Sequence, residues 1–180
     1  MSDSALFQGF PKIPRLVNEE MVVTEKIDGT NAQVLVEPDG DVWAGSRNRW
    51  LTPESDNFGF AGWVRDHKDQ LRGLGVGRHF GEWWGLGIQR RYGVSDKRFW
   101  LFREREMRPE CVGVVPEIYR GPAGDAKVAD ILAGLKKDGS RAVPGWMQPE
   151  GIVVHYLLSN ARWKRLCENE CLRKGEVAHA

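Results

Sequence analysis

The sequence of 180 residues has few cysteines and almost no excess of charge of either sign. Its three cysteines, Cys111, Cys167 and Cys171, are too few and odd in number for a disulfide scaffold, which indicates a reducing compartment. Cys167, Cys171 and His179 could bind a metal, but the sequence has no second Cys/His pair at the spacing of a zinc finger. We therefore interpret Cys167 and Cys171 as thiols one turn apart on a helix. A small disulfide-stabilised domain is therefore excluded.

The sequence also lacks a long apolar segment, an internal repeat and a low-complexity tract. No apolar run approaches the ~20 residues that span a bilayer, and residues 1–10 lack the charged and apolar regions of a signal peptide. We therefore expect a cytoplasmic protein without membrane association. The formal net charge of +1 does not by itself require a nucleic-acid partner. Local basic clusters fit either phosphate contacts or a mixed surface. They comprise Arg47, Arg49, Arg90, Arg91, Lys97, Arg98, Arg103, Arg105, Arg108 and residues 162–165.

Length and hydrophobic content predict one domain spanning residues 1–180, because 41% hydrophobic residues can fill one core but this length is short for two. Periodicity and turn residues indicate an α+β fold, with antiparallel strands joined by turns at Asp28-Gly29 and Asp39-Gly40. Asp125 is a candidate N-cap for the second helix, which Asp138-Gly139 should end. The predicted strands are 21–24, 32–36, 42–44, 78–84, 99–102, 112–119, 151–157 and 161–166, and the predicted helices are 58–71, 126–137 and 168–174.

The segment 22–32, VVTEKIDGTNA, places one amine at the end of an apolar, strand-forming run. Lys26 comes just before the Asp28-Gly29 turn, where the backbone can bend around a ligand. A lysine in this position, flanked by Glu25 and Asp28, can act as a covalent nucleophile if its surroundings favour the neutral amine. A solvated hairpin lysine explains this short segment about equally well.

Four other segments favour the first interpretation. Glu82 in HFGEWWG and Glu150 in PEGIVVH are single carboxylates in apolar strands, where a charge is costly without a partner. RFWLF at 98–102 is a short apolar strand, and RWKRL at 162–166 places Arg162 and Lys164 on one strand face. Two carboxylates and two basic strand positions together indicate a site for a metal-bound polyphosphate.

The order of these segments resembles the covalent nucleotidyltransferase superfamily of ATP-dependent nucleic-acid ligases and messenger-RNA capping enzymes. Within it, the string EKIDGTN is most similar to the RNA ligases that repair nicks. A K-x-D-G string alone is weak, but six ordered segments between residues 25 and 166 form a specific pattern. They are Lys26 to Gly29, Ser46-Arg47, Glu82, Phe99 to Phe102, Glu150-Gly151 and Lys164.

The resemblance implies an adenylyltransferase domain, an ATP-grasp-like nucleotidyltransferase fold of antiparallel sheets flanked by helices. It also implies an ATP-dependent RNA ligase that uses Mg²⁺ or Mn²⁺. Lys26 would attack the α-phosphate of ATP to form lysyl-AMP, AMP would pass to a 5′-phosphate end, and a 3′-hydroxyl would displace it. The implied catalytic residues are Lys26, Asp28, Glu82, Glu150 and Lys164, and the implied nucleotide-binding residues are Glu25, Lys26, Asn31, Arg47, Glu82, Phe102, Val153, Arg162 and Lys164.

Individual roles follow from the same resemblance. Glu150 would contact the metal, because hard carboxylate oxygen suits Mg²⁺. Glu82 would hold the ribose hydroxyls, and Arg47 the ribose or a substrate phosphate. Phe102 and Val153 would sandwich the adenine, although core filling is their ordinary alternative. Asp28 and Asn31 would lie beside the ribose and the metal-bound waters.

Two residues depart from the family pattern. Arg103 follows Phe102 where these RNA ligases usually have aspartate, and Arg162 replaces the first lysine of motif V, which keeps the charge but not an adjustable amine. The short segment after Leu166 leaves no room for an appended C-terminal domain, which predicts a minimal nucleotidyltransferase core.

The expected partner is nicked or broken RNA, with an RNA/DNA hybrid or DNA as alternatives, and a protein partner is left open. A DNA ligase and an end-adenylylating enzyme are the alternatives within the enzyme class. A noncatalytic nucleic-acid-binding module is disfavoured, because a binder does not need Lys26, Glu82, Glu150 and Lys164 together.

Overall fold

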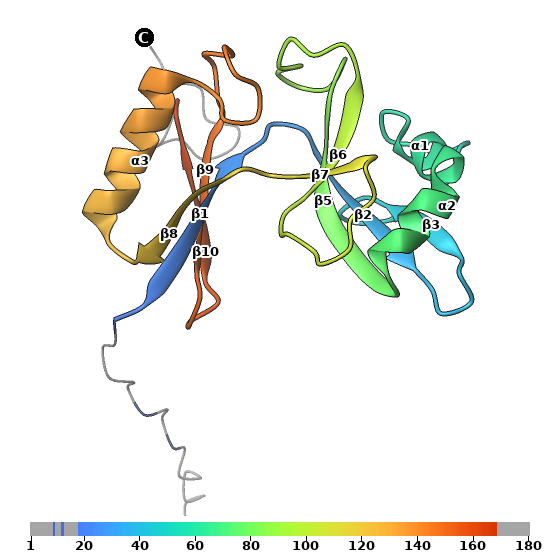
Figure 1. Cartoon of the computed structure of the whole chain (residues 1–180), viewed down its shortest axis with the longest axis horizontal. Helices are drawn as coiled ribbons and strands as arrows, with labels where there is room; N and C mark the ends of the chain where they lie inside the picture. The colour runs from blue at the N-terminus through green and yellow to red at the C-terminus, as the bar shows by residue number, and fades with distance from the viewer. Residues whose placement is uncertain (1–8, 10–11, 13–17, 169–180) are drawn as a thin grey trace, which may run out of the picture.

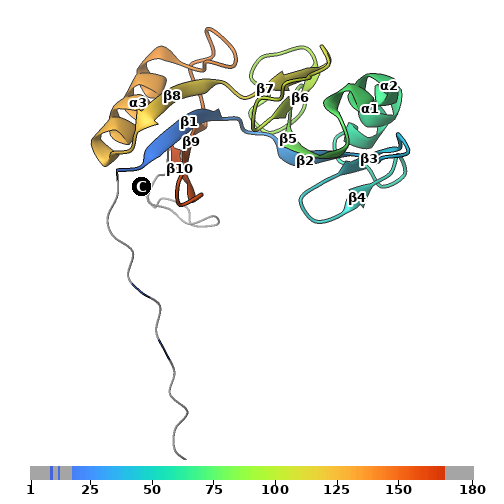
Figure 2. The same ribbon diagram turned by 60° about the horizontal axis from the view of Figure 1, so that its bottom comes forward.

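The computed structural model describes residues 9, 12 and 18–168, which form two sheets arranged side by side (Figure 1, Figure 2). The four-stranded sheet has the order β10-β9-β1-β8 and is wholly antiparallel. Its strands are β1 (Glu20–Lys26), β8 (Glu117–Pro122), β9 (Gly151–Tyr156) and β10 (Arg162–Leu166), and helix α3 (Asp125–Asp138) packs against it.

The second sheet is six-stranded, in the order β4-β3-β2-β5-β6-β7, and only its β6–β7 pair is parallel. Helices α1 (Phe60–Asp66) and α2 (Lys68–Leu71) and the 3₁₀ turn η1 (Arg72–Leu74) lie beside this sheet (Figure 1). The strands are β2 (Thr30–Val36), β3 (Val42–Gly45), β4 (Trp50–Leu51), β5 (Gly77–Gly85), β6 (Lys97–Leu101) and β7 (Val112–Val114). The predicted α+β class is confirmed.

Each sheet has one apolar face, because alternate side chains of a strand point to opposite faces. Met21 and Val23 of β1 pack with Val128 and Leu132 of α3. In the six-stranded sheet Val34 belongs to a cluster with residues of α1 and α2. The helices therefore cover one face of each sheet and leave the other face available for a site.

The predicted hairpin at Asp28-Gly29 is wrong, because β1 and β2 belong to different sheets. Strand β1 pairs with β8 and β9, whereas β2 pairs with β3 and β5. Gly29 is needed for close approach: a Cβ there would lie 2.5 Å from the carbonyl oxygen of Trp83. The segment therefore passes from one sheet to the other along β5.

The predicted strand 112–119 is also wrong, because it is divided between the two sheets at Val115 and Pro116. Proline has no backbone N–H and cannot continue a ladder through this point. The carbonyl oxygen of Pro116 instead accepts a hydrogen bond from the backbone N–H of Glu25 at 2.9 Å. The chain thus passes between the two sheets a second time at Val115 and Pro116, beside the connection that carries Asp28.

The remaining elements are close to the prediction. The helix at 58–71 is interrupted at His67, whose φ of −110° is not helical. Helix α3 is confirmed, but Asp125 is its first residue and Gly124 is the cap. The short strand β4 was not predicted. Glu168 is not helical, and the rest of the predicted helix 168–174, with Cys171, lies outside the described residues, as does His179.

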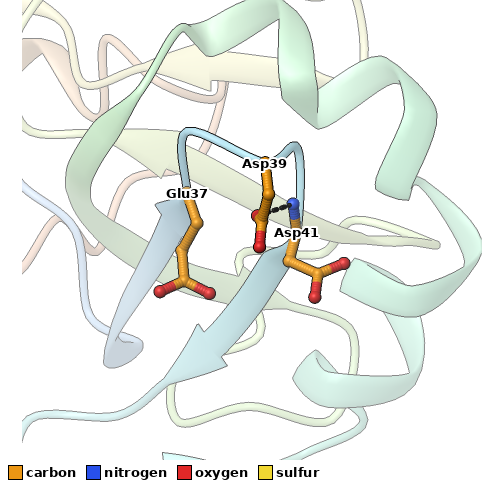
Figure 3. Close-up of side chains that lie close together, drawn as sticks. All are labelled: Glu37, Asp39 and Asp41. Atoms are coloured by element: carbon orange, nitrogen blue, oxygen red, sulfur yellow. Dashed lines mark hydrogen bonds between the residues drawn. The ribbon is translucent and has the colours of Figure 1, made fainter.

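The predicted β2–β3 hairpin at Asp39-Gly40 is confirmed, and three carboxylates gather on it (Figure 3). The backbone N–H of Asp41 donates to Asp39 at 2.9 Å, and the indole of Trp43 donates to Glu37 at 2.6 Å. Lys68 forms a 2.8 Å ion pair with Asp41. These contacts explain the cluster as part of the hairpin and its packing on α2.

None of the helices within the described ranges has the length and apolar character required to cross a bilayer.

Candidate active site

A cleft of about 2290 Å³ lies between the uncovered faces of the two sheets. One wall is set by strand register, because directly opposed residues share a face. Lys26 is opposite Gly151, and Thr24 is opposite Val153, which is in turn opposite Lys164. The register thus brings motif residues from β1, β9 and β10 to one surface.

The other wall comes from the six-stranded sheet. Asn31 of β2 is opposite Glu82 of β5, and Gln33 is opposite Phe80. These four residues line the cleft, together with Arg47, which follows β3. Motifs that are far apart in the sequence therefore face each other across the cleft.

Lys26 and Glu150 are in direct contact at the base of the cleft. The Lys26 Nζ lies 2.5 Å from Glu150 Oε2, and their side chains are 23% and 15% exposed. Topology explains the contact, because Lys26 ends β1 and Glu150 immediately precedes the paired strand β9. Burial raises the pKa of the Glu150 carboxyl, whereas its bond with Lys26 acts in the opposite direction. The structure thus brings these two residues together in the cleft.

Glu82 is a deeply buried carboxylate of the cleft, with 7% of its surface exposed. Burial raises its pKa to about 7, opposed by the charge of Lys26 and by hydrogen bonds from Asn31 and the Gly29 backbone. The Asn31 amide donates to Glu82 at 3.1 Å, and Arg47 Nε donates to Asn31 Oδ1 at 2.7 Å. The side chains of Arg47, Asn31 and Glu82 therefore form one connected polar chain.

Glu82→Gln is expected to stabilise the folded protein. The folded-state pKa of about 7 lies above the usual value of 4.5, so the unfolded chain loses the Glu82 proton first as pH rises. Ionisation of Glu82 therefore lowers the free energy of unfolding progressively from pH 4.5 to about 7 and by a constant amount above that. Glutamine removes this cost, so the free energy of unfolding should rise by about 3 kcal/mol at about pH 8. This increase should vanish below the usual glutamate pKa.

Urea unfolding of wild type, Glu82→Gln and the exposed control Glu106→Gln at several pH values measures this gain. Equal stability of wild type and Glu82→Gln at about pH 8 would contradict it.

Asp28 is held by two residues that the sequence analysis did not assign to the site. Arg90 Nε lies 3.1 Å from Asp28 Oδ2, and the Tyr92 hydroxyl accepts the backbone N–H of Asp28 at 2.9 Å. Burial raises the pKa of Tyr92, so its hydroxyl stays protonated. Gln89, Arg91 and Tyr92 adopt positive φ angles of 43°, 62° and 51°, which are uncommon for such residues. The loop is thus held in an uncommon conformation beside Asp28.

Glu25, a predicted nucleotide-binding residue, lines the cleft, but its carboxylate is bound by the loop after α3. Glu25 alternates with Lys26 along β1, and only 1% of its surface is exposed. One carboxylate oxygen accepts the Ser140 hydroxyl at 2.6 Å, and the other accepts the backbone N–H groups of Arg141 and Ala142 at 2.7 and 2.9 Å. Glu25 therefore anchors the loop after α3.

The other predicted nucleotide-binding residues line the cleft as well. Phe102 follows β6 and is 41% exposed, Val153 is half-buried, and Arg162 and Lys164 are exposed on β10. Arg103, at the position where the family usually has aspartate, lies 3.2 Å from the imidazole of His155 on β9. Arg103 thus connects the two walls of the cleft, and His155 lines it.

Comparison with protein families matches residues 19–162 to the family described as RNA ligase. The chain belongs to the RNA ligase family. No curated protein matches the sequence.

Similar solved structures include mutants of a Naegleria gruberi RNA ligase. An apo form has 20% identity and a TM-score of 0.62, covering 82% of this chain and 49% of that one. A form with ATP and Mn has 18% identity and a TM-score of 0.63, and the match covers 83% of this chain and 50% of that one. A form with AMP and Mn has 19% identity and a TM-score of 0.60, and the match covers 82% of this chain and 49% of that one. The shared feature is the fold, and this chain spans about half the length of those ligases.

Proposed function

We propose that this RNA ligase family member is an ATP-dependent RNA ligase that works through a lysyl-AMP intermediate. The observation that carries the proposal is the contact between the Lys26 amine and Glu150 at the base of a cleft that also contains Glu82. A pure binding module has no need for an amine placed beside one buried and one partly buried carboxylate. Residues 18–168 would act as one nucleotidyltransferase unit, since both sheets contribute to this cleft.

In the first step, the neutral amine of Lys26 attacks the α-phosphorus of ATP. An N–P bond forms, the P–O bond to pyrophosphate breaks, and the amine loses a proton. Phe102 and Val153 line the cleft where they can hold the adenine, and Glu82 as a carboxylate can accept ribose hydroxyl hydrogen bonds. Arg162 and Lys164 provide exposed positive charge for the leaving pyrophosphate.

The second and third steps return Lys26 to its starting form. An oxygen of the RNA 5′-phosphate attacks the phosphorus of lysyl-AMP, and the N–P bond breaks. The 3′-hydroxyl of the adjoining end then attacks the 5′-phosphate, forming the phosphodiester and releasing AMP. Arg47, which already donates to Asn31, would contact the ribose or a substrate phosphate near this reaction centre.

The donor set of the cleft fits a hard divalent cation, because Glu150 and Glu82 offer carboxylate oxygens in a buried setting. We assign the direct contact to Glu150. When bound, Mg²⁺ or Mn²⁺ supplies positive charge that favours a neutral amine and stabilises the departing phosphate oxygens. Asp28 and Asn31 would hold the waters of the cation.

A DNA ligase and an end-adenylylating enzyme remain the alternative functions, and we propose a cytoplasmic location from the low cysteine content. Incubation with α-labelled ATP and Mg²⁺ tests the central proposal: an acid-labile, base-stable AMP adduct supports it, and absence of the adduct supports a binding module. Joining of a nicked substrate by the adenylylated protein separates a ligase from an enzyme that stops at the adenylylated end.

We expect the adenylylated protein to seal a nick with ribonucleotides on its 3′-hydroxyl side faster than an all-DNA nick, because 2′-hydroxyl groups and A-form shape distinguish RNA. Activity should fall steeply as salt rises from about 50 to 200 mM, since phosphate contacts provide much of the affinity. A panel of duplexes that differ only in the sugars beside the nick measures both effects. Equal or faster sealing of the all-DNA nick would favour the DNA ligase alternative.

A further inference from the structure

Trp50 and Phe80 are large aromatic side chains that are exposed in one row on the cleft side of the six-stranded sheet. Trp50 of β4 is 44% exposed and Phe80 of β5 is 54% exposed. They occupy one row of the sheet, because Trp50 is opposite Gly45, Gly45 is opposite Gln33, and Gln33 is opposite Phe80. Opposed residues share a face, so both rings project from the same surface.

Arg78 completes this surface. Its guanidinium lies 5.0 Å from the centre of the Trp50 ring, and it donates to Gln33 Oε1 at 3.0 Å. The Gln33 amide in turn donates to the carbonyl oxygen of Ser46 at 2.9 Å. Arg78 and Gln33 are therefore fixed between the two rings. We call Trp50, Arg78 and Phe80 the stacking platform.

The row continues into the proposed nucleotide site. The backbone N–H of Phe102 donates to the carbonyl oxygen of Phe80 at 3.1 Å, so Phe102 extends β6 directly beside Phe80. Three strand spacings separate Trp50 from Phe80, a distance of roughly 14 Å. A strand with its bases stacked advances about 3.4 Å per nucleotide, so about four stacked nucleotides cover the platform.

The charges around the platform match a polyanion. Arg105 donates to the carbonyl oxygen of Arg78 at 3.4 Å, and Arg47 and Arg103 line the same cleft. Glu104, which also lines it, is paired with Arg108 at 3.2 Å. An apolar protein partner would bury the Arg78 guanidinium without a counter-charge, whereas a nucleic-acid strand offers phosphates to the arginines and base faces to the rings.

We propose that the stacking platform binds unpaired bases of RNA next to the end that is joined. This inference rests on the proposed RNA ligase function, because the platform leads to Phe102, the ring assigned to adenine. Bases stack on Trp50 and Phe80, and Arg78 contacts the connecting phosphates. The substrate class is therefore RNA with a single-stranded segment beside the break.

Fluorescence anisotropy of a short labelled single-stranded RNA, with the full chain at one moderate salt concentration, tests the platform. Trp50→Ala and Phe80→Ala should each raise the Kd roughly 5- to 100-fold, the range reported by alanine substitution of stacking rings. Trp50→Phe should keep most of the affinity, because it keeps an aromatic face, whereas Phe80→Leu should weaken binding as alanine does. Circular dichroism and thermal unfolding of each variant verify folding.

Trp163→Ala is the matched control, because Trp163 is 65% exposed on β10 and alternates with the cleft-lining residues Arg162 and Lys164. It should bind RNA as wild type does. For an oligonucleotide of equal length with abasic sites, wild type and Trp50→Ala should have the same Kd, because the phosphates remain but the bases that stack are absent. Unchanged affinity of Trp50→Ala and Phe80→Ala for the single-stranded RNA would overturn the platform.

Two further outcomes are decisive. A wild-type dimer that Trp50→Ala converts to a monomer would assign this surface to self-association and overturn RNA binding as its role. Adenylylation of the wild-type protein with α-labelled ATP separates this result from the proposed function. If the AMP adduct forms but RNA binding does not depend on the stacking platform, only the platform proposal is refuted. If RNA binds through the platform but no adduct forms, only the ligase proposal is refuted.

Discussion

Lys26→Ala is expected to abolish formation of the AMP adduct. The Lys26 amine is the lysine nitrogen in contact with Glu150 at the base of the cleft, and alanine leaves no nucleophile there. Lys164 also lines the cleft, but it lies on β10 and is exposed. Incubation with α-labelled ATP and Mg²⁺ followed by denaturing electrophoresis measures the adduct directly.

Lys26→Arg should also form no AMP adduct, although arginine retains the positive charge opposite Glu150. Guanidinium stays protonated and cannot supply a free electron pair. Lys136→Ala, which removes an exposed amine from α3, is the matched control and should form the adduct normally. A normal adduct in either Lys26 variant would assign the nucleophile to another residue.

Local sequence strings predicted the motif residues but not how the strands that carry them pair. The Asp28-Gly29 dipeptide is a common hairpin signal, yet β1 and β2 enter different sheets. Both strands have partners that are distant in sequence, such as β9 for β1, and turn propensity carries no information about those partners. Lys26, Glu82 and Glu150 were still identified, because a charged residue in an apolar strand is conspicuous whatever its pairing.

Residues that support the site were harder to recognise. Arg90 and Tyr92 hold Asp28 from a loop whose sequence has no charge or spacing pattern pointing to Asp28. Gly85, Gly87 and Gly93 adopt positive φ angles in that segment, but glycines in a sequence do not indicate what a loop contacts. Glu25 shows the opposite case, since its place in the motif suggested the nucleotide, whereas strand alternation turns it toward Ser140.

The crossing at Pro116 could have been inferred more readily. A proline inside the predicted strand 112–119 argues against a continuous ladder. Strand β7 ends before this residue in one sheet, and strand β8 begins after it in the other sheet. Together with the crossing at Asp28, it joins the two walls of the cleft, so the position of the site depends on both irregular segments.

Glu150→Gln is expected to lower the adenylylation rate by about 10² to 10³-fold while the protein stays folded. Glutamine keeps the shape and can still accept a hydrogen bond from Lys26, but it lacks the charge that attracts a divalent cation. Burial already raises the pKa of Glu150, so a neutral side chain is tolerated well at this position. The variant should also need a much higher Mg²⁺ concentration to reach half of its maximal rate.

A Mg²⁺ titration of single-turnover adenylylation, with thermal unfolding of the same preparations, separates the two effects. Glu106→Gln, which removes an exposed carboxylate, should match wild type in both measurements. A Glu150→Gln variant with unchanged Mg²⁺ dependence and rate would show that the carboxylate serves only to pair with Lys26. A large fall in melting temperature would instead assign Glu150 to stability, because loss of one partner of a buried ion pair leaves the other charge uncompensated.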